Sequence, residues 1–185
     1  MKEEIIIAGF GGQGVLSMGK ILAYSAIMQD LEVTWMPSYG PEMRGGTANV
    51  CVIISDRKIS SPIITKYDTA IILNQQSLDK FENNVKPGGL LIYDPSGITR
   101  APVRKDIGIY SIDAIEVAAE IGSSKVYNMA VLGAYLKAKP SSLKMENVVK
   151  GLEKSIPARY GDLIQKNREA IEKGMERVKI VSAND

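Results

Sequence analysis

The stretch GFGGQG, residues 9–14, holds glycines at a spacing suited to binding an anion. Gly9, Gly11 and Gly14 fit G-x-G-x-x-G, directly after an apolar run of strand length and before a helical pattern. Glycines permit a tight turn and let a phosphate approach the backbone, and the N–H groups of the following helix favour negative charge. The candidate residues of an anion or cofactor site are therefore Gly9, Gly11, Gly12, Gln13 and Gly14.

The second half of a dinucleotide fingerprint is missing. That fingerprint also needs an acid at the end of the second strand, to bind ribose hydroxyls. Here the second strand ends in WMPS, and Glu32 lies at its start. Three interpretations stay open at this point: NAD binding, glycines that only allow tight packing of strand on helix, and a phosphate site without dinucleotide recognition.

A second glycine-rich stretch, SYGPEMRGGTAN, spans residues 38–49. Pro41 stiffens the turn, and the flanking glycines allow backbone angles closed to other residues. Arg44 offers a planar fork of five donors suited to carboxylate or phosphate, and Glu42 is a candidate partner for it. The glycines of this loop are Gly40, Gly45 and Gly46.

The amino-acid composition argues against several classes of function. The 185 residues are 45% hydrophobic and 24% charged, with a net charge of +2, so the global balance indicates neither nucleic acid nor membrane as a partner. The one cysteine, Cys51, lies in an apolar run and reads as a small buried hydrophobe in a reducing compartment. The sequence has no histidine, which removes the commonest general base and zinc ligand. We expect no signal peptide, no membrane span and a cytoplasmic location.

The periodicity predicts one α/β domain over residues 1–185. Apolar runs predict strands over 4–10, 32–38, 48–55, 69–74 and 90–95, and a shorter strand within 104–113. Helical spacing predicts helices within 11–30, 75–85, 114–122, 128–138, 142–156 and 162–179. No helical period separates the second and third strands, so the sheet is expected to be mixed. The predicted fold is Rossmann-like and three-layered, with a mixed, mostly parallel sheet and a helical C-terminal part.

Finer details are also predicted. Pro37 is expected to end the second strand, and ISDRKISSP, residues 54–62, to form a hairpin turn with a short return strand. KPGG, residues 86–89, reads as a turn. Ser142 is expected to cap the helix within 142–156, and the tail SAND, residues 182–185, to fray.

Both glycine-rich stretches together resemble a known family. AGFGGQGVLSMGKILAYSA with WMPSYGPEMRGGTANVCVIIS, strengthened by NMAVLGAYLK, is similar to the gamma subunit of 2-oxoacid:ferredoxin oxidoreductases. The same module is the gamma domain of single-chain pyruvate:ferredoxin oxidoreductase. The form of the second loop looks most like the 2-oxoglutarate and branched-chain enzymes, and the resemblance covers nearly the whole chain.

The resemblance implies a holoenzyme that decarboxylates a 2-oxoacid, with 2-oxoglutarate favoured, on thiamine diphosphate and Mg²⁺. Electrons pass through an iron–sulfur cluster to ferredoxin, and coenzyme A takes the acyl group. This chain has no thiamine motif and no cysteine set for a cluster. The resemblance therefore implies a non-catalytic chain that binds no cofactor or metal alone. Its expected partners are alpha, beta and delta-type subunits, and a homodimer is possible in isolation.

The resemblance also implies that the second loop lies beside the glycine turn and faces the catalytic subunits, where its expected role is in assembly or in the coenzyme A site. Asn128 opens the NMAVLG helix and is either its N-cap or part of the same face. Tyr39 is expected to pack at an interface or to stack on a ring. The residues of this face are Ser38, Tyr39, Gly40, Pro41, Glu42, Arg44, Gly45, Gly46 and Asn128. Alternatives are a solvated surface turn, a stand-alone nucleotide-binding protein and a ligand-free assembly module.

Overall fold

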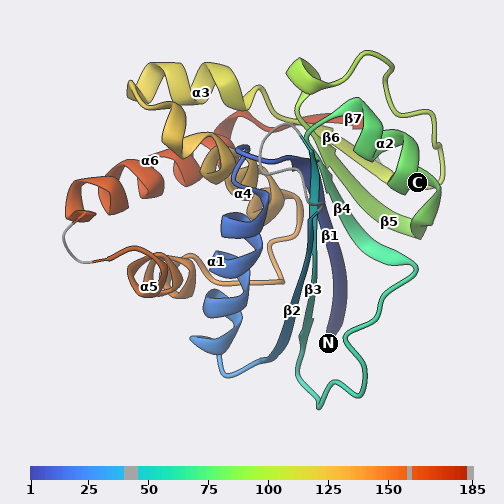
Figure 1. Ribbon diagram of the computed structural model, residues 1–185, viewed down its shortest axis with the longest axis horizontal. Helices are drawn as coiled ribbons and strands as arrows, with labels where there is room; N and C mark the ends of the chain where they lie inside the picture. Colours follow the sequence, from blue (N-terminus) through green and yellow to red (C-terminus); the bar gives the residue numbers. More distant parts are fainter. Residues whose placement is uncertain (40–45, 158–159, 183–185) are drawn as a thin grey trace.

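The computed structural model describes residues 1–39, 46–157 and 160–182. Seven strands form one sheet in the order β2-β3-β1-β4-β5-β6-β7 (Figure 1). The strands are β1 (Lys2–Phe10), β2 (Glu32–Tyr39), β3 (Thr47–Ser55), β4 (Tyr67–Ile72), β5 (Val85–Tyr93), β6 (Gly108–Ser111) and β7 (Lys179–Ser182). The α-helices are α1 (Val15–Ile27), α2 (Gln75–Phe81), α3 (Ala114–Ile121), α4 (Tyr127–Ala138), α5 (Met145–Ser155) and α6 (Gly161–Arg177). Short 3₁₀ turns are η1 (Glu82–Asn84), η2 (Pro95–Gly97) and η3 (Ser124–Val126).

The predicted mixed sheet is confirmed. β1, β4, β5 and β6 form a parallel block in its centre, whereas β2, β3 and β7 run antiparallel to their neighbours. Helices α1, α3, α4, α5 and α6 lie on one side of the sheet and α2 on the other, which gives the three layers (Figure 1). All carboxyl ends of the parallel block therefore meet at one end of the sheet, where α1 also begins.

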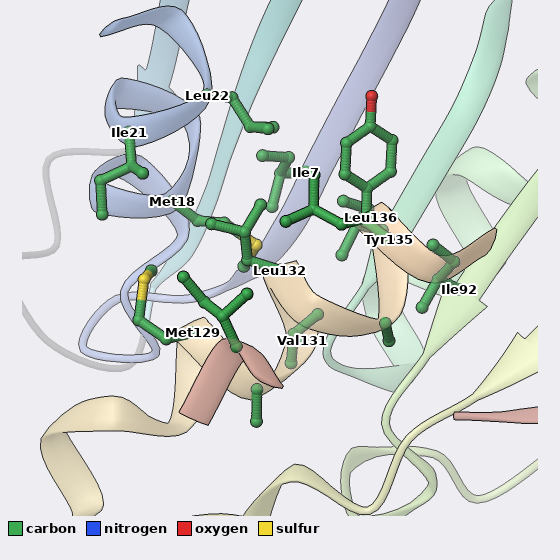
Figure 2. Packing of buried hydrophobic residues seen from close by; sticks show 14 of the residues in the cluster. Ile7, Met18, Ile21, Leu22, Ile92, Met129, Val131, Leu132, Tyr135 and Leu136 are labelled. Atoms are coloured by element: carbon green, nitrogen blue, oxygen red, sulfur yellow. The ribbon is translucent and has the colours of Figure 1, made fainter. Parts of the chain in front are cut away.

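Strand β1 is the middle of the core because it is buried on both faces. Ile5 and Ile7 face the larger helical layer, and Ile6 and Ala8 face the layer that contains α2. Figure 2 shows the larger layer, in which Met18 and Leu22 of α1 gather with Met129, Leu132 and Tyr135 of α4 around Ile7. Burial on both faces explains why the sequence shows a continuous apolar run here and no alternation.

Two predicted breaks in the sheet were wrong. Pro37 does not end the second strand: β2 continues to Tyr39, and Pro37 lies opposite Val50 of β3. A proline is tolerated there because β2 is an edge strand of the sheet. The return strand predicted after Asp56 is also absent, since residues 56–66, all described, hold no strand and β4 instead pairs parallel with β1.

The predicted KPGG turn lies inside β5. Val85 pairs with Tyr67 and Leu90 with Thr69, so the four residues between Val85 and Leu90 bulge out of the ladder. Gly88 has φ 74°, a backbone angle that favours glycine. The pattern therefore located the irregularity, but the chain rejoins the strand after it.

Ser142 does not cap a helix. Helix α5 begins at Met145 with Lys144 as its N-cap. The Ser142 hydroxyl instead lies 2.6 Å from the hydroxyl of Tyr135, which also donates to the buried carboxylate of Glu3 at 3.1 Å. Ser142 takes part in a buried polar network because the fold brings it beside Tyr135. No local sequence pattern indicates this proximity.

The end of the chain also differs from expectation. Helix α6 ends at Arg177, and Lys179–Ser182 forms β7 against β6, where the sequence predicted helix and then fraying. The last residues of the expected tail, 183–185, lie outside the described residues. Cys51 is buried as predicted, and burial raises the pKa of its thiol.

Helices α4 and α6 approach each other at two glycines. A Cβ placed on Gly133 would lie 2.1 Å from the carbonyl oxygen of Ile171, and one on Gly174 would lie 2.0 Å from that of Ala130. Neither contact leaves room for a methyl group, and both oxygens belong to backbone that cannot rotate away. The pair of glycines therefore sets the distance between the two helices.

We predict that Gly133→Ala and Gly174→Ala each lower the free energy of unfolding by on the order of 1–3 kcal/mol, because the helices must separate. Gly161→Ala is the control, since a Cβ there meets no atom within 4 Å. Urea unfolding followed by circular dichroism measures all three. Equal unfolding midpoints for Gly174→Ala and the wild type would contradict this prediction, because the two helices would then accommodate the added methyl group without loss of stability.

Candidate functional site

The glycine turn follows β1 at the end of the sheet where the parallel strands finish. The next helix, α1, covers one face, and α2, which follows the adjacent strand β4, covers the other (Figure 1). Neighbouring connections that leave toward opposite faces create a crevice, the usual place for a ligand in an open α/β sheet. The turn thus lies where the topology favours a site.

Gln13 closes the turn with its side chain. Its Oε1 accepts a hydrogen bond from the N–H of Phe10 at 2.6 Å, and its Nε2 donates to the carbonyl of Leu73 at 3.2 Å. These bonds tie the exit of β1 to the end of β4. Both ends of the amide group are thus hydrogen-bonded inside the fold, and a ligand-binding role of Gln13 stays a prediction.

The glycines of the turn have different tasks. A Cβ on Gly9 would lie 2.6 Å from Gln13 Oε1 and 2.9 Å from Leu73 Cβ, so Gly9 is needed for close packing. Gly12 and Gly14 have φ of 99° and 74°, where other residues are strained. The packing interpretation thus accounts for Gly9, whereas backbone angle accounts for Gly12 and Gly14.

Asn128 joins the glycine turn to α4. Its side chain is 8% exposed, and Nδ2 donates to the carbonyl of Gly14 at 3.2 Å. Helix α4 begins one residue earlier, with Val126 as its N-cap, so Asn128 does not cap this helix. The alternative placement, on the same face as the glycine turn, agrees with the structure.

The C-terminal end of the second loop also contacts the glycine turn. The N–H of Gly11 donates to the carbonyl of Gly46 at 2.9 Å, and Ser38 and Tyr39 belong to β2, opposite Asn49 and Ala48. The centre of the loop lies outside the described residues, and so does the side chain of Tyr39. The roles of its residues remain predictions: Gly40, Pro41, Glu42, Arg44 and Gly45.

The sheet order does not favour a standard dinucleotide site. In that arrangement the acid for the ribose follows a strand parallel and next to β1. Here β3 separates β2 from β1, and the parallel neighbour is β4. The chain leaves β4 through Leu73 and Asn74, neither of which is acidic.

A cleft of about 740 Å³ opens beside the glycine turn. Gly12, Gly14 and Ser17 line one side, and helix α3 lines another with Ile115 and Ala119. Sequence reasoning missed this cleft. In the sequence, the α3 residues that line the cleft appear only as the apolar face of a predicted helix, and such a face is equally typical of core packing.

Half-buried Tyr127 forms a further wall of this cleft. Burial raises the pKa of Tyr127, and the nearby negative charge of Asp94 adds to the shift. Asp94 is 0% exposed, and its Oδ1 accepts from the N–H of Ser96 at 2.8 Å. One sequence feature points to this residue, because an acid directly follows the apolar run LLIY.

Metal and membrane features are few. Within residues 1–39, 46–157 and 160–182, no group of three or more His, Cys, Asp or Glu side chains is arranged to hold a metal ion. The helices of the described part of the chain also include none that is long and apolar enough to cross a membrane.

Comparison with known sequences decides the family. The profile described as pyruvate ferredoxin/flavodoxin oxidoreductase matches residues 4–177. The chain belongs to this family. Within the family it is of the gamma-subunit type, since solved gamma subunits share its fold over nearly their whole length.

Curated relatives of the gamma-type chain include subunits of a 2-oxoglutarate synthase and of a ketoisovalerate oxidoreductase. 2-Oxoglutarate synthase subunit KorC of Methanocaldococcus jannaschii is 35% identical over 182 residues, which cover 97% of this chain and 95% of the relative. Ketoisovalerate oxidoreductase subunit VorA of Methanothermobacter thermautotrophicus is 35% identical over 173 residues, 94% of this chain but 36% of the relative. The chain thus spans about a third of the length of that relative.

Two solved structures agree with this type. The keto/oxoacid ferredoxin oxidoreductase gamma subunit of Geobacter sulfurreducens PCA superposes with a TM-score of 0.82 at 29% identity, over 96% of each chain. The 2-oxoglutarate:ferredoxin oxidoreductase of Magnetococcus marinus, described with 2-oxoglutarate, coenzyme A and succinyl-CoA bound, gives 0.84 at 25% identity, over 95% of this chain and 30% of that one.

The contact between Gly14 and Asn128 generates a prediction. A Cβ on Gly14 would lie 2.5 Å from Asn128 Nδ2, whereas one on Gly12 meets no atom of the described residues within 4 Å. Both positions have positive φ, so alanine costs about 1–2 kcal/mol of backbone strain at either. Gly14→Ala should therefore lower the free energy of unfolding more than the control Gly12→Ala.

A double-mutant cycle isolates the collision. Asn128→Ala should restore part of the stability that Gly14→Ala loses and none of what Gly12→Ala loses. Denaturant unfolding of the three single variants and the two double variants, with the wild type, measures the coupling. Additive losses for Gly14→Ala and Asn128→Ala would show that the two residues do not press on each other.

Proposed function

We propose that this gamma-type chain works inside a complex that decarboxylates a 2-oxoacid, transfers the acyl group to coenzyme A and reduces ferredoxin. In this proposal the chain is not catalytic alone. Its glycine turn and second loop form one wall of the coenzyme A site, facing the catalytic subunits. The hydrogen bond between Gly11 and Gly46 carries the proposal, because it joins the two family motifs on one surface.

The proposed 2-oxoacid is 2-oxoglutarate. The names of the KorC relative and of the Magnetococcus marinus enzyme support this choice. The VorA relative, named for ketoisovalerate, supports a branched-chain 2-oxoacid as the alternative. Both relatives are 35% identical to this chain, but the match covers 95% of the KorC relative and only 36% of the VorA relative.

Thiamine diphosphate, Mg²⁺ and the iron–sulfur cluster belong to other subunits in this proposal. A cluster needs several thiolates, and this chain has one cysteine, which is buried. The residues present therefore do not fit a cluster. The proposed partners are alpha, beta and delta-type subunits, with ferredoxin meeting the complex and not this chain.

Coenzyme A fits the glycine turn chemically. It carries a diphosphate and a ribose phosphate, and the turn offers backbone N–H groups at the start of α1. Gly12 is exposed and has no side chain, so a phosphate can approach the backbone closely. Arg44 would add a charged fork from the second loop. These residues would bind and orient the diphosphate; the chemistry of acyl transfer belongs to coenzyme A itself.

An assembly module without a ligand is the second candidate. The packing roles of Gly9 and Gln13 favour it, because they explain part of the motif without any phosphate. A stand-alone nucleotide-binding protein is less well supported, since the sheet order leaves no place for a ribose-binding acid beside β1.

The proposal also includes one domain over residues 1–185 and a cytoplasmic location. The single seven-stranded sheet supports the first. The single cysteine, which fits a reducing compartment, supports the second.

Reconstitution tests the proposed function. The purified chain alone should not reduce a viologen dye with 2-oxoglutarate, coenzyme A and thiamine diphosphate, because it lacks the cofactor-binding residues. Adding the catalytic and cluster-bearing subunits should produce dye reduction, and omitting this chain from the mixture should abolish it. Dye reduction by the chain alone, or undiminished activity without it, would contradict the proposal.

Arg44→Ala tests the second loop. If the guanidinium meets a buried anion in the complex, its loss should weaken assembly or coenzyme A binding by about 2–5 kcal/mol. Arg44→Lys should rescue little, because an ammonium lacks the bidentate geometry. Thermal melting of the free chain should stay nearly unchanged. Co-purification of the complex and a coenzyme A titration of its activity are the measurements.

Arg57→Ala is the matched control, because Arg57 is an exposed arginine that follows β3 at the end of the sheet opposite to the glycine turn. A solvated arginine contributes ~0–1 kcal/mol. Wild-type assembly with an unchanged Michaelis constant in Arg44→Ala would show that the loop is only a surface turn.

A further inference from the structure

The outer side of α1 and the edge strand β2 carry large apolar side chains that the described part of the fold leaves uncovered. Ile27 is 48% exposed, Trp35 is 40% exposed and Met36 is 37% exposed. Helix α1 lies against β2, which forms one edge of the sheet (Figure 1). Together with Lys20 and Tyr24 of α1, these residues form what we call the α1–β2 surface. Exposed apolar residues that gather in one place are typical of a protein–protein contact.

Trp35 is a fixed aromatic side chain at the centre of this surface. A Cβ on Gly19 of α1 would lie 3.2 Å from Trp35 Nε1, so the indole lies directly on the helix where a side chain is missing. Gly19, Ala23 and Ile27 are spaced four residues apart and therefore lie in one row along α1, which leads from the indole to Ile27. A tryptophan that is already held in place loses little conformational entropy on binding, and tryptophan is frequent among the residues that dominate binding energy.

The apolar surface continues around the edge of the sheet. Met36 follows Trp35 in an extended strand, so its side chain points to the opposite face, where it lies across from Cys51 of β3. Charged side chains often protect a free edge strand, but residues 33–38 of β2 carry no charge. Both faces of this edge therefore offer apolar contacts to a partner.

A second copy of this chain is the less suitable partner. Two copies would extend the sheet by pairing β2 with β2, and such pairing uses the outward N–H groups of the strand. Pro37 has no N–H, and a proline within an edge strand occupies a position whose nitrogen faces away from the sheet. Pro37 thus interrupts the pairing and leaves the side chains of β2, more than its backbone, to contact a partner.

Lys20 sets a polar requirement for the partner. Its side chain is exposed, and its ammonium lies 5.7 Å from the centre of the Tyr24 ring. A cation beside an apolar contact is complementary to a carboxylate on the other protein. The partner surface should therefore be apolar where it meets Trp35 and acidic where it meets Lys20.

We propose that the α1–β2 surface binds a catalytic subunit of the complex, through a contact of side chains that covers Ile27, Trp35 and Met36. The inference rests on the proposed function for the identity of the partner. Strand β2 leads at Tyr39 directly into the second loop, for which we propose a position facing the catalytic subunits. The α1–β2 surface extends that interface from the loop along the edge of the sheet.

The single tryptophan makes this contact directly observable. Trp35 is the one tryptophan among the 185 residues, so the full chain labelled with 5-fluorotryptophan gives one ¹⁹F resonance. Addition of the unlabelled catalytic and cluster-bearing subunits should shift this resonance and abolish its difference between H₂O and D₂O, because the indole leaves the solvent. Raising the concentration of the labelled chain by itself should leave the resonance unchanged.

Ile27→Glu tests the same contact through affinity. It should weaken assembly at least about tenfold, because the contact would bury an unpaired carboxylate. Ile180→Glu is the matched control, since Ile180 is 65% exposed on β7, the opposite edge of the sheet. Titration of the other subunits into each labelled variant measures the affinity, and thermal melting of the free chains checks that both variants fold.

An unchanged resonance in a complex that reduces the dye would overturn the inference and leave the proposed function standing. A resonance that moves with the concentration of the chain alone would also overturn it, because the surface would then bind a second copy. Equal assembly of Ile27→Glu and Ile180→Glu would do the same. Absent dye reduction with a shifted resonance would contradict the proposed function alone, and absent dye reduction with an unchanged resonance would contradict both.

Discussion

The two hydrogen bonds of Gln13 hold the site end of the molecule together. The amide accepts from the N–H of Phe10 and donates to the carbonyl of Leu73, so one side chain satisfies two backbone groups at the ends of adjacent parallel strands. Gly9 must lack a side chain for this amide to fit. The position of α1, the angle of the turn and the opening of the cleft all follow from this closure.

The second constraint is the packing of α4. Its N-terminal end holds Asn128 against Gly14, and further along it accepts α6 at Gly133. Helix α4 therefore contacts both α6 and the glycine turn, and so fixes one relative to the other. The cleft wall that contains Tyr127 is consequently held beside the turn by the contact between Asn128 and Gly14, both of which line the cleft.

Much of the fold was readable from the sequence because local patterns set it. Doubly buried strands such as β1 appear as unbroken apolar runs, and the missing helix between β2 and β3 revealed the mixed sheet. Pro37 and Ser142 were misread because an edge position and a buried network decided their roles, and both depend on distant chain. Of the candidate site, the glycine turn and Asn128 were found from motifs. Asp94, Tyr127 and the cleft residues of α3 were missed, because the cleft is built from residues that lie far apart in the sequence.

The order of the strands also bears on how the chain folds during synthesis. β1 is made first, β2 and β3 can pair as a hairpin that docks through β3, and β4, β5, β6 and β7 then add outward in chain order. Each new strand meets a free edge, so no strand must be inserted between two that are already paired. The growing polypeptide can therefore extend its sheet as it leaves the ribosome, which shortens the time for which an unpaired central edge is open to aggregation.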